Sequence, residues 1–430
     1  MTDPAVDALR PGNQPATPAR PAAPHQPSGT APERVDAPSG GPATAQEQGS
    51  APPGGPATAA EQVDAPPAVR GGRAGEPADV PPATRGGVPK GLDLDRLAAY
   101  LAERRPELVG GPLTATLIAG GKSNLTYLLR DGDRELVLRR PPLGHVLATA
   151  HDMAREHRVI TALAPTAVPV PAALLLCADP AIIGAPFYLM AKVDGRVLRS
   201  RVQTDPLTAG QRHDLAMAMM DTLAALHTVD PAEVGLADFG RPDGYLGRQV
   251  RRWAGQLEKS RSRALPGVEE LRDALADSVP ERADAGRVVH GDFRLDNLLT
   301  TTDPVAVRAV LDWEMATLGD PLADLGLLLT YWDVLGDSDL AEGNPVADGL
   351  GPRAGFPTGA DLIDRYAGRS DVDVGPLHWH VALGCFKLAV ICEGIHYRHT
   401  LGQTLGGGFD RIGELVDPLV EHGLHAVRER

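Results

Sequence analysis

An aspartate and an asparagine stand five residues apart in the segment HGDFRLDN, residues 290–297. Asp292 could accept or orient the proton of a hydroxyl group, and Asn297 could offer its amide oxygen to a cation. A short apolar segment, 307–311, ends directly before Asp312, where rigid backbone could hold a second oxygen ligand. One amide and one carboxylate suit Mg²⁺, which prefers few and hard oxygen ligands from the protein. The three residues therefore predict a general base beside a magnesium site.

The segment 290–297 has a simpler explanation when it is taken alone, namely a hairpin turn with a capping aspartate. Four fixed residues at this spacing recur by chance in roughly one of several hundred chains of this length. Asp312 adds a second candidate ligand fifteen residues after Asn297. Phosphoryl transfer from ATP requires metal ions that neutralise phosphate charge, an acceptor for the alcohol proton and clamps for the nucleotide. The combination therefore indicates an ATP- and magnesium-dependent phosphotransferase.

Residues upstream of this motif could hold the nucleotide. The segment AGGKSN, residues 119–124, is a glycine-containing turn between two predicted strands. Backbone N–H groups and short polar side chains in such a turn can approach phosphates, although most turns of this kind are only hairpins. The candidate nucleotide-binding residues of this turn are Gly120, Gly121, Ser123 and Asn124.

A basic residue at the end of the third predicted strand could clamp the phosphates. Arg139 stands in LVLRRPP, and Glu156 on the following predicted helix could orient its guanidinium, which can grip phosphate oxygens in a bidentate manner. A solvated basic edge with an unrelated glutamate is the alternative. The neighbouring Arg140 competes with Arg139 for the same role.

The elements that must position these residues divide the chain into a strand-rich part and a helical part. Within residues 112–193, the sequence predicts strands at 114–118, 125–129, 135–139, 172–177 and 186–191, with one helix inserted at 146–163. From Thr208 onward the hydrophobic spacing predicts helices at 211–227, 248–259, 268–277, 322–334, 361–366, 376–396 and 409–422. Two short predicted strands, 287–289 and 307–311, flank the segment 290–297. An earlier helix at 94–105 is closed by Pro106.

Residues 1–90 differ sharply from the rest of the chain. They hold 19 of the 40 prolines, a single leucine, no isoleucine and no aromatic residue. Such a segment cannot bury enough apolar area to offset the entropy of ordering it. The repeats GGPATAQEQ and GGPATAAEQ within it have no hydrophobic face that could stack. We therefore expect a disordered tail.

Composition excludes several other classes of protein. The net charge of −14 argues against a nucleic-acid-binding protein, which needs a basic surface. The three cysteines have apolar neighbours and no zinc-type spacing, so we expect them to be reduced and buried. No segment has the pattern of a signal peptide or a membrane span. We expect a cytoplasmic protein without a membrane partner, and nothing in the sequence indicates an oligomeric state.

The ordered set of motifs resembles the aminoglycoside phosphotransferase/choline kinase-like superfamily over about residues 93–425. Within it, the chain is most similar to the kinase-like domain associated with acyl-CoA dehydrogenases. HGDxxxxN followed by the aspartate is specific to the superfamily, and the subgroup likeness rests on longer segments. These segments are GGKSNLTYLL (120–129), VLRRPP (137–142), AREHRVI (154–160), IGAPFYLM (183–190), HGDFRLDNLL (290–299), LDWEMATLGDPLADLG (311–326) and ICEGIHYRHTLGQ (391–403).

The resemblance implies an α+β, two-lobed protein-kinase-like fold, with a strand-rich N-lobe at 91–194 and a helical C-lobe at 195–430. ATP would lie between the lobes, and the backbone around Ala191 and Val193 would meet the adenine. His290 and Asp324 would brace the catalytic loop. The resemblance further implies that Asp292 is the catalytic base. Asn297 and Asp312 would be the Mg²⁺ ligands. Arg139 would be the phosphate clamp, with Glu156 as its partner. Many members of the superfamily have lysine where this chain has Arg139, although arginine is common in this subgroup.

The subgroup likeness leads to the hypothesis that the acceptor is the hydroxyl group of a hydroxyacyl-CoA or a related hydroxy acid. An aminoglycoside-type antibiotic kinase is the first alternative, because the acidic chain is compatible with a cationic substrate. A cationic sugar requires clustered carboxylates, whereas a CoA ester requires basic and apolar groups. A catalytically silent kinase-fold binding module is the second alternative.

Overall fold

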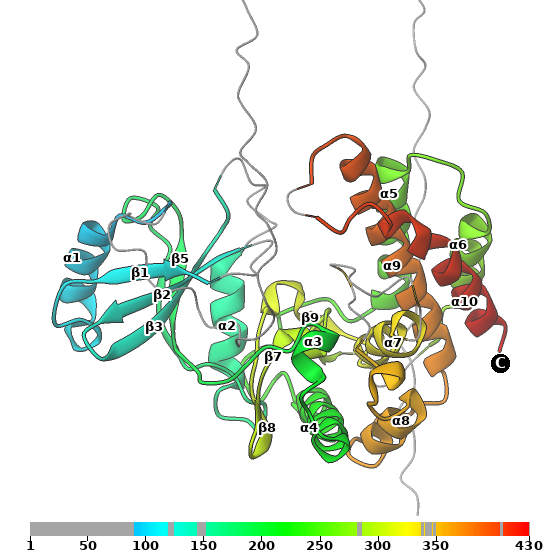
Figure 1. Ribbon diagram of the computed structural model, residues 1–430, viewed down its shortest axis with the longest axis horizontal. Helices are drawn as coiled ribbons and strands as arrows, with labels where there is room; N and C mark the ends of the chain where they lie inside the picture. Colours follow the sequence, from blue (N-terminus) through cyan, green and yellow to red (C-terminus); the bar gives the residue numbers. More distant parts are fainter. Residues whose placement is uncertain are drawn as a thin grey trace, which may run out of the picture. The chain divides into compact units, whose positions relative to one another are not determined.

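A five-stranded antiparallel sheet in the order β1-β2-β3-β5-β4 forms the strand-rich part of the chain, and Figure 1 labels β1, β2, β3 and β5. The computed structural model describes residues 90–118, 124–143, 152–281, 286–336, 339, 346, 350–404 and 407–429. The strands are β1 (Thr114–Leu117), β2 (Leu125–Asp131), β3 (Arg134–Arg140), β4 (Ala173–Cys177) and β5 (Phe187–Ala191). The strand-rich part of the predicted α+β fold is thereby confirmed.

Alternate residues of β3 face opposite sides of this sheet. Leu138 packs in one hydrophobic cluster with α1 (Leu94–Arg104), whereas Val137 packs in another with α2 (Met153–Leu163). The same alternation directs Arg139 to the α2 side and Arg140 to the α1 side. The pleat of β3 therefore separates the two candidate clamps.

The helix α2 begins at Met153, later than the predicted start at residue 146. Asp152 has an extended backbone, and its carboxylate accepts the N–H of Arg155 at 3.0 Å. An aspartate at this position satisfies an otherwise unpaired N–H group and so sets the start of a helix. Residues 144–151, on which the rest of the predicted helix falls, lie outside the described residues.

The part of the chain after residue 195 is mainly helical, as predicted. The helices are α3 (Arg201–Thr204), α4 (Ala209–Thr228), α5 (Tyr245–Ser260), α6 (Val268–Asp277), α7 (Leu322–Leu329), α8 (Gly359–Ala367), α9 (Leu377–Thr400) and α10 (Val416–Arg428). Two antiparallel two-stranded ribbons interrupt them. One pairs β6 (Arg287–Val289) with the distant β9 (Thr317–Gly319), and the other is the hairpin of β7 (Leu298–Thr302) and β8 (Val305–Val310). β7 and β9 were not predicted. The predicted helix at 322–334 is an α-helix only as far as Leu329 and continues as the π-helical turn Thr330–Leu335.

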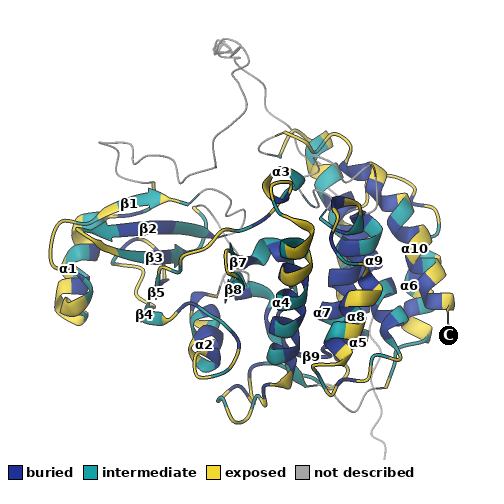
Figure 2. Ribbon diagram, turned by 60° about the horizontal axis from the view of Figure 1, so that its bottom comes forward, coloured by how far each residue is buried: buried dark blue, intermediate teal, exposed yellow. Residues whose placement is uncertain are grey.

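The helix α9 lies at the centre of the helical lobe. It packs against α5, α6, α7 and α10 and is buried over most of its length (Figure 2). Gly326 on α7 allows the closest approach, because a Cβ there would lie 2.5 Å from the carbonyl carbon of His380 on α9. The core of this lobe therefore brings α7 and α9 to the base of the loop that carries Asp292.

One hydrophobic cluster joins the sheet to the helical lobe. It contains Met153 and Val159 of α2 together with Leu215 of α4 and Phe293 of the segment 290–297. Backbone hydrogen bonds between Arg196 and Thr300 add a second link, at 2.8 and 2.9 Å. None of the helices in the described residues is long and apolar enough to cross a membrane. All three cysteines are buried and unpaired, as predicted.

Candidate active site

The loop between β6 and β7 carries the segment 290–297, and Asp324 of α7 holds its first turn. The Asp324 carboxylate accepts the N–H groups of His290 and Gly291, both at 2.7 Å, and lies 3.3 Å from His227 Nε2. Burial opposes the charge of this carboxylate, but His227 and the backbone donors outweigh it and hold the pKa of Asp324 below its usual value. The prediction that Asp324 braces the loop is confirmed by these contacts.

Gly291 is required by the shape of this turn. Its φ is +84°, and a Cβ at this position would lie 2.8 Å from both the Cβ and the carbonyl oxygen of Met315. Glycine adopts this left-handed conformation without steric cost, whereas other residues are strained there. The loop can therefore pass close to the segment after Asp312 only with glycine at position 291.

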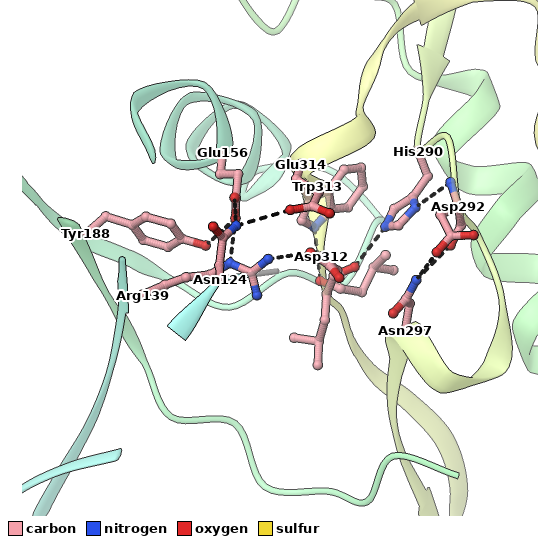
Figure 3. A network of polar contacts seen from close by, with 12 residues as sticks. Asn124, Arg139, Glu156, Tyr188, His290, Asp292, Asn297, Asp312, Trp313 and Glu314 are labelled. Atoms are coloured by element: carbon pink, nitrogen blue, oxygen red, sulfur yellow. Dashed lines mark hydrogen bonds and ion pairs between the residues drawn. The ribbon is translucent and has the colours of Figure 1, made fainter. Parts of the chain in front are cut away.

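His290 links the loop to the end of β8. Its Nε2 donates to the carbonyl oxygen of Leu311 at 2.8 Å, and its Nδ1 accepts the N–H of Asp292 at 3.3 Å (Figure 3). A neutral imidazole has one donor and one acceptor nitrogen, so these partners place the proton on Nε2. The ring packs against Phe293 and Trp313. His290 therefore fixes Asp292 relative to the residue before Asp312, as expected of a brace.

Asp292 and Asn297 face each other across the loop (Figure 3). The Asn297 amide nitrogen donates to the carbonyl oxygen of Asp292 at 2.8 Å and to its carboxylate oxygen Oδ2 at 3.1 Å. The backbone carbonyl oxygen of Asn297 in turn accepts the N–H of Leu311 at 2.8 Å. The structure therefore brings the candidate base and both candidate metal ligands to one place.

Asp312 has an unusual backbone conformation. It is the one non-glycine residue of the described chain with a positive φ, at 63°. Aspartate and asparagine tolerate this conformation better than other residues, and residues held in it are common at functional sites. It turns the chain sharply after β8, and the Asp312 carboxylate meets the guanidinium of Arg139.

Arg139 is the centre of a polar network that crosses between the lobes (Figure 3). Its side chain is only 11% exposed, and its guanidinium pairs with Glu156 (Nε to Oε2, 2.8 Å) as well as with Asp312. Burial by itself would lower the pKa of Arg139, but these two carboxylates outweigh it and raise that pKa. Glu156 also accepts from Tyr188 at 3.0 Å and from Asn124 at 2.9 Å. Arg139 is therefore a permanent cation beside the candidate metal ligands.

Arg140 lies on the other side of the sheet. Its guanidinium donates to the carbonyl oxygens of Gly91 and of Ile183, the latter at 3.0 Å. These contacts tie the start of the described chain to the strand-rich lobe. Of the two arginines that the sequence left open, only Arg139 reaches Asp312.

The other predicted nucleotide contacts are less fully described. Asn124 lies in the site, where its amide nitrogen donates to Glu156 and to Glu314 (3.2 Å). Gly120, Gly121 and Ser123 lie outside the described residues. Ala191 ends β5, and its N–H donates to the carbonyl oxygen of Ala172 at 2.9 Å, so only its carbonyl group and the backbone of Val193 could meet a base.

The oxygen atoms around Asp292 have the chemistry of a magnesium site. Asn297 uses its amide nitrogen for both of its side-chain hydrogen bonds to described residues, which leaves its amide oxygen as a ligand. Asp312 adds a carboxylate that is 33% exposed. The described residues contain no group of three or more His, Cys, Asp or Glu side chains suited to holding a metal. One amide and one carboxylate leave the other positions around Mg²⁺ to phosphate and water, which this ion prefers.

A cavity of about 480 Å³ opens beside Gly291. Its apolar lining includes Trp253, Leu327 and Leu383, and its cationic lining consists of Arg155, Arg241, Arg248, Arg252 and Lys387. These cations were not among the predicted site residues. Arg248 and Arg252 are four residues apart on α5, so that spacing could have indicated one basic helix face, but not what the face adjoins.

The comparisons with known proteins agree with this fold. Residues 114–360 match the model of the phosphotransferase enzyme family, and the chain belongs to that family.

The chain also has curated relatives among longer proteins. It is 34% identical to acyl-CoA dehydrogenase family member 11 of Rattus norvegicus over 342 residues, which are 78% of this chain and 43% of that protein. It is 34% identical to acyl-CoA dehydrogenase family member 10 of Mus musculus over 337 residues, which are 76% of this chain and 30% of that protein. The chain thus spans less than half the length of these relatives.

Solved structures show the same fold. A protein of Ralstonia eutropha JMP134 that is assigned as an aminoglycoside phosphotransferase has 31% identity and a TM-score of 0.67, with 79% of this chain and 99% of that chain covered. The GDP complex of aminoglycoside 2'-phosphotransferase-IIIa has a TM-score of 0.51 at 16% identity, with 77% and 99% covered. The second likeness concerns the fold alone.

Replacing Asp324 with asparagine should destabilise the protein. The amide can accept only one of the two N–H groups, so a buried donor is left unpaired at a cost of about 1–3 kcal/mol. The melting temperature should fall by about 2–4 °C for each kcal/mol, measured by thermal denaturation. Asp371→Asn, which breaks an ion pair with Arg287 at a carboxylate that is 65% exposed, is the control and should leave the melting temperature unchanged. Equal losses in the two variants would contradict the bracing role.

Proposed function

We propose that the chain is a cytoplasmic, ATP- and magnesium-dependent kinase that phosphorylates the hydroxyl group of a small molecule. The observation that carries this proposal is the convergence of Asp292, Asn297 and Asp312 within one hydrogen-bonded loop system. The phosphotransferase family of the chain supports it. A silent binding module would be expected to lack one of these three residues, and none is missing.

The proposed reaction uses Asp292 as the base. The acceptor oxygen attacks the γ-phosphorus, the bond from that phosphorus to the β–γ bridging oxygen breaks, and ADP leaves. The proton of the acceptor hydroxyl passes to the Asp292 carboxylate. The hydrogen bond from the Asn297 amide to Asp292 orients this carboxylate before the acceptor arrives.

The nucleotide would be held by groups from both lobes. Asn297 and Asp312 would hold Mg²⁺, which when bound neutralises charge on the phosphate oxygens. Arg139 would bind phosphate while Glu156 keeps its guanidinium in place. The proposed contacts to the remaining phosphates and to the adenine come from Gly120, Gly121, Ser123 and Asn124 and from the backbone of Ala191 and Val193.

The cavity beside Gly291 supports an anionic acceptor, specifically a hydroxyacyl-CoA or a related hydroxy acid. Within the described chain, Arg241, Arg248 and Arg252 have no carboxylate partner. Each acidic residue of the same cavity accepts a hydrogen bond or forms an ion pair. Asp152 and Asp324 accept backbone N–H groups, Glu314 accepts from Asn124, and Glu156 pairs with Arg139. The lining has five cationic and four acidic side chains, so its net charge is positive, which suits phosphate and carboxylate groups and opposes a cationic amino sugar. The acyl-CoA dehydrogenase names of the curated relatives agree with a CoA ester.

Turnover in variants of the three converging residues tests the kinase assignment. Asp292→Asn should lower kcat by roughly 10²–10⁴-fold with nucleotide binding retained, because only the proton acceptor is lost. Asp312→Asn should lose magnesium-dependent nucleotide binding, because a metal ligand is lost. The measurement is ATP consumption with a panel of hydroxylated acceptors, and Asp238→Asn, an exposed surface aspartate paired with Arg158, is the control. Equal rates in all variants would contradict the assignment, and ATP binding without turnover on any acceptor would support the silent module.

Charge reversal in the cavity distinguishes the two acceptor classes. Arg252→Glu should lower kcat/KM for hydroxyacyl-CoA esters by about tenfold or more, with the KM for ATP unchanged, because it places a like charge near an anionic substrate. Arg251→Glu is a matched control, since Arg251 is exposed on the same helix and does not line the cavity. If the chain were an aminoglycoside kinase, Arg252→Glu would instead raise kcat/KM for amino sugars. Cells that express the chain would also grow in the presence of aminoglycosides.

A further inference from the structure

Lys387 is a half-buried cation of the helical lobe that the proposed reaction does not yet use. It lies on α9, where its neighbours Phe386 and Leu388 are fully buried. Its side chain lines the cavity beside Gly291 together with Leu327, Leu383 and Trp253. A lysine among apolar side chains loses hydration, and this burial lowers its pKa, although Asp292 and Asp324 partly oppose the shift.

The contacts of Lys387 connect it to the candidate base. Its Nζ donates to the carbonyl oxygen of Gly291 at 2.7 Å, one residue before Asp292. The same Nζ lies 5.4 Å from the ring centroid of Trp253. No carboxylate of the described residues lies within ion-pair distance of it. An ammonium group has three donors, and the described hydrogen bond uses one of them.

The two remaining N–H donors of the Lys387 ammonium group could bind an oxygen of the acceptor. A desolvated cation is costly unless an oxygen ligand compensates it, and strongly perturbed groups in a cavity are common at functional sites. The hydroxyl of the acceptor must lie beside Asp292 for its proton to be transferred. An oxygen near that hydroxyl on the same molecule would then lie where Lys387 can donate to it.

We propose that Lys387 is a specificity-determining residue, whose ammonium group donates to the carbonyl or carboxylate oxygen of a hydroxyacyl acceptor and so directs the hydroxyl to Asp292. This inference rests on the proposed kinase function and deepens it, because it assigns recognition of the acyl group to one side chain. A thioester and a free acid both supply such an oxygen. A purely structural lysine, which only holds the Gly291 carbonyl, is the alternative that the experiment must separate.

The experiment compares acceptors that differ in one oxygen. The 430-residue chain, its Lys387→Met variant and a control variant are assayed with hydroxyacyl-CoA esters, with the free hydroxy acids and with alcohols of matched length that lack the carbonyl group. Lys259→Met is the control, since Lys259 is exposed on α5 away from the cavity. The quantity measured is the ratio of kcat/KM for the acyl acceptor to kcat/KM for the matched alcohol.

The wild-type ratio should exceed about tenfold and should fall by about 10–100-fold in Lys387→Met, the range for a hydrogen bond to a charged group. A larger fall for the free acid identifies a carboxylate as the ligand, and a larger fall for the thioester identifies a carbonyl. A structural role would lower both values of kcat/KM by the same factor and preserve the ratio, which would overturn the inference.

The preference of the wild-type enzyme, measured as the ratio of kcat/KM for the acyl acceptor to kcat/KM for the matched alcohol, tests the inference even if Lys387→Met does not fold. A wild-type enzyme that phosphorylates both acceptors equally overturns the inference and leaves the kinase function intact. A wild-type enzyme that phosphorylates none of these alcohols contradicts the proposed function itself, and the inference falls with it.

Discussion

The rest of the site depends on the charge balance around Arg139. A buried guanidinium does not lose its proton, so nearby carboxylates must compensate its charge. Breaking one of these ion pairs leaves an uncompensated charge. Glu156 comes from the strand-rich lobe, whereas Asp312 comes from the helical lobe. The requirement to neutralise one side chain therefore fixes the distance between the two lobes at the place where a nucleotide would lie. A bound nucleotide with its metal would change this balance by adding negative phosphates for Arg139 and a cation for Asp312.

A second constraint fixes the loop that carries Asp292. Asp324 holds the backbone of this loop from α7, and Lys387 holds it from α9, so two neighbouring helices of the core determine where one carboxylate lies. Gly291 is the point at which both meet. The candidate base is thus positioned by buried and rigid elements, while the cations of α5 lie at more accessible positions around the same cavity. This division separates the groups that orient the reaction from those that would recognise the acceptor.

Most of the strands and helices and the converging residues Asp292, Asn297 and Asp312 could be predicted because local spacing and a specific motif carry that information. The choice between Arg139 and Arg140 could also have been made, since strand alternation around Leu138 puts them on opposite faces. The start of α2 was placed too early because the capping role of Asp152 was overlooked. β7 pairs with the adjacent β8 across residues 303–304, and its run of threonines could have indicated a strand. β9, the cationic cavity and the role of Lys387 depend on contacts between segments far apart in the sequence, which no local pattern contains.

The central claim is that Asn297 and Asp312 form a magnesium site for a nucleotide that faces Asp292. A crystal structure of the 430-residue chain with Mg²⁺ and a non-hydrolysable ATP analogue tests it most directly. The account predicts a metal ion bound by the amide oxygen of Asn297 and the carboxylate of Asp312 at about 2.0–2.1 Å, with the terminal phosphate directed toward Asp292. A metal ion held by other residues, or a nucleotide bound away from Arg139, would contradict it.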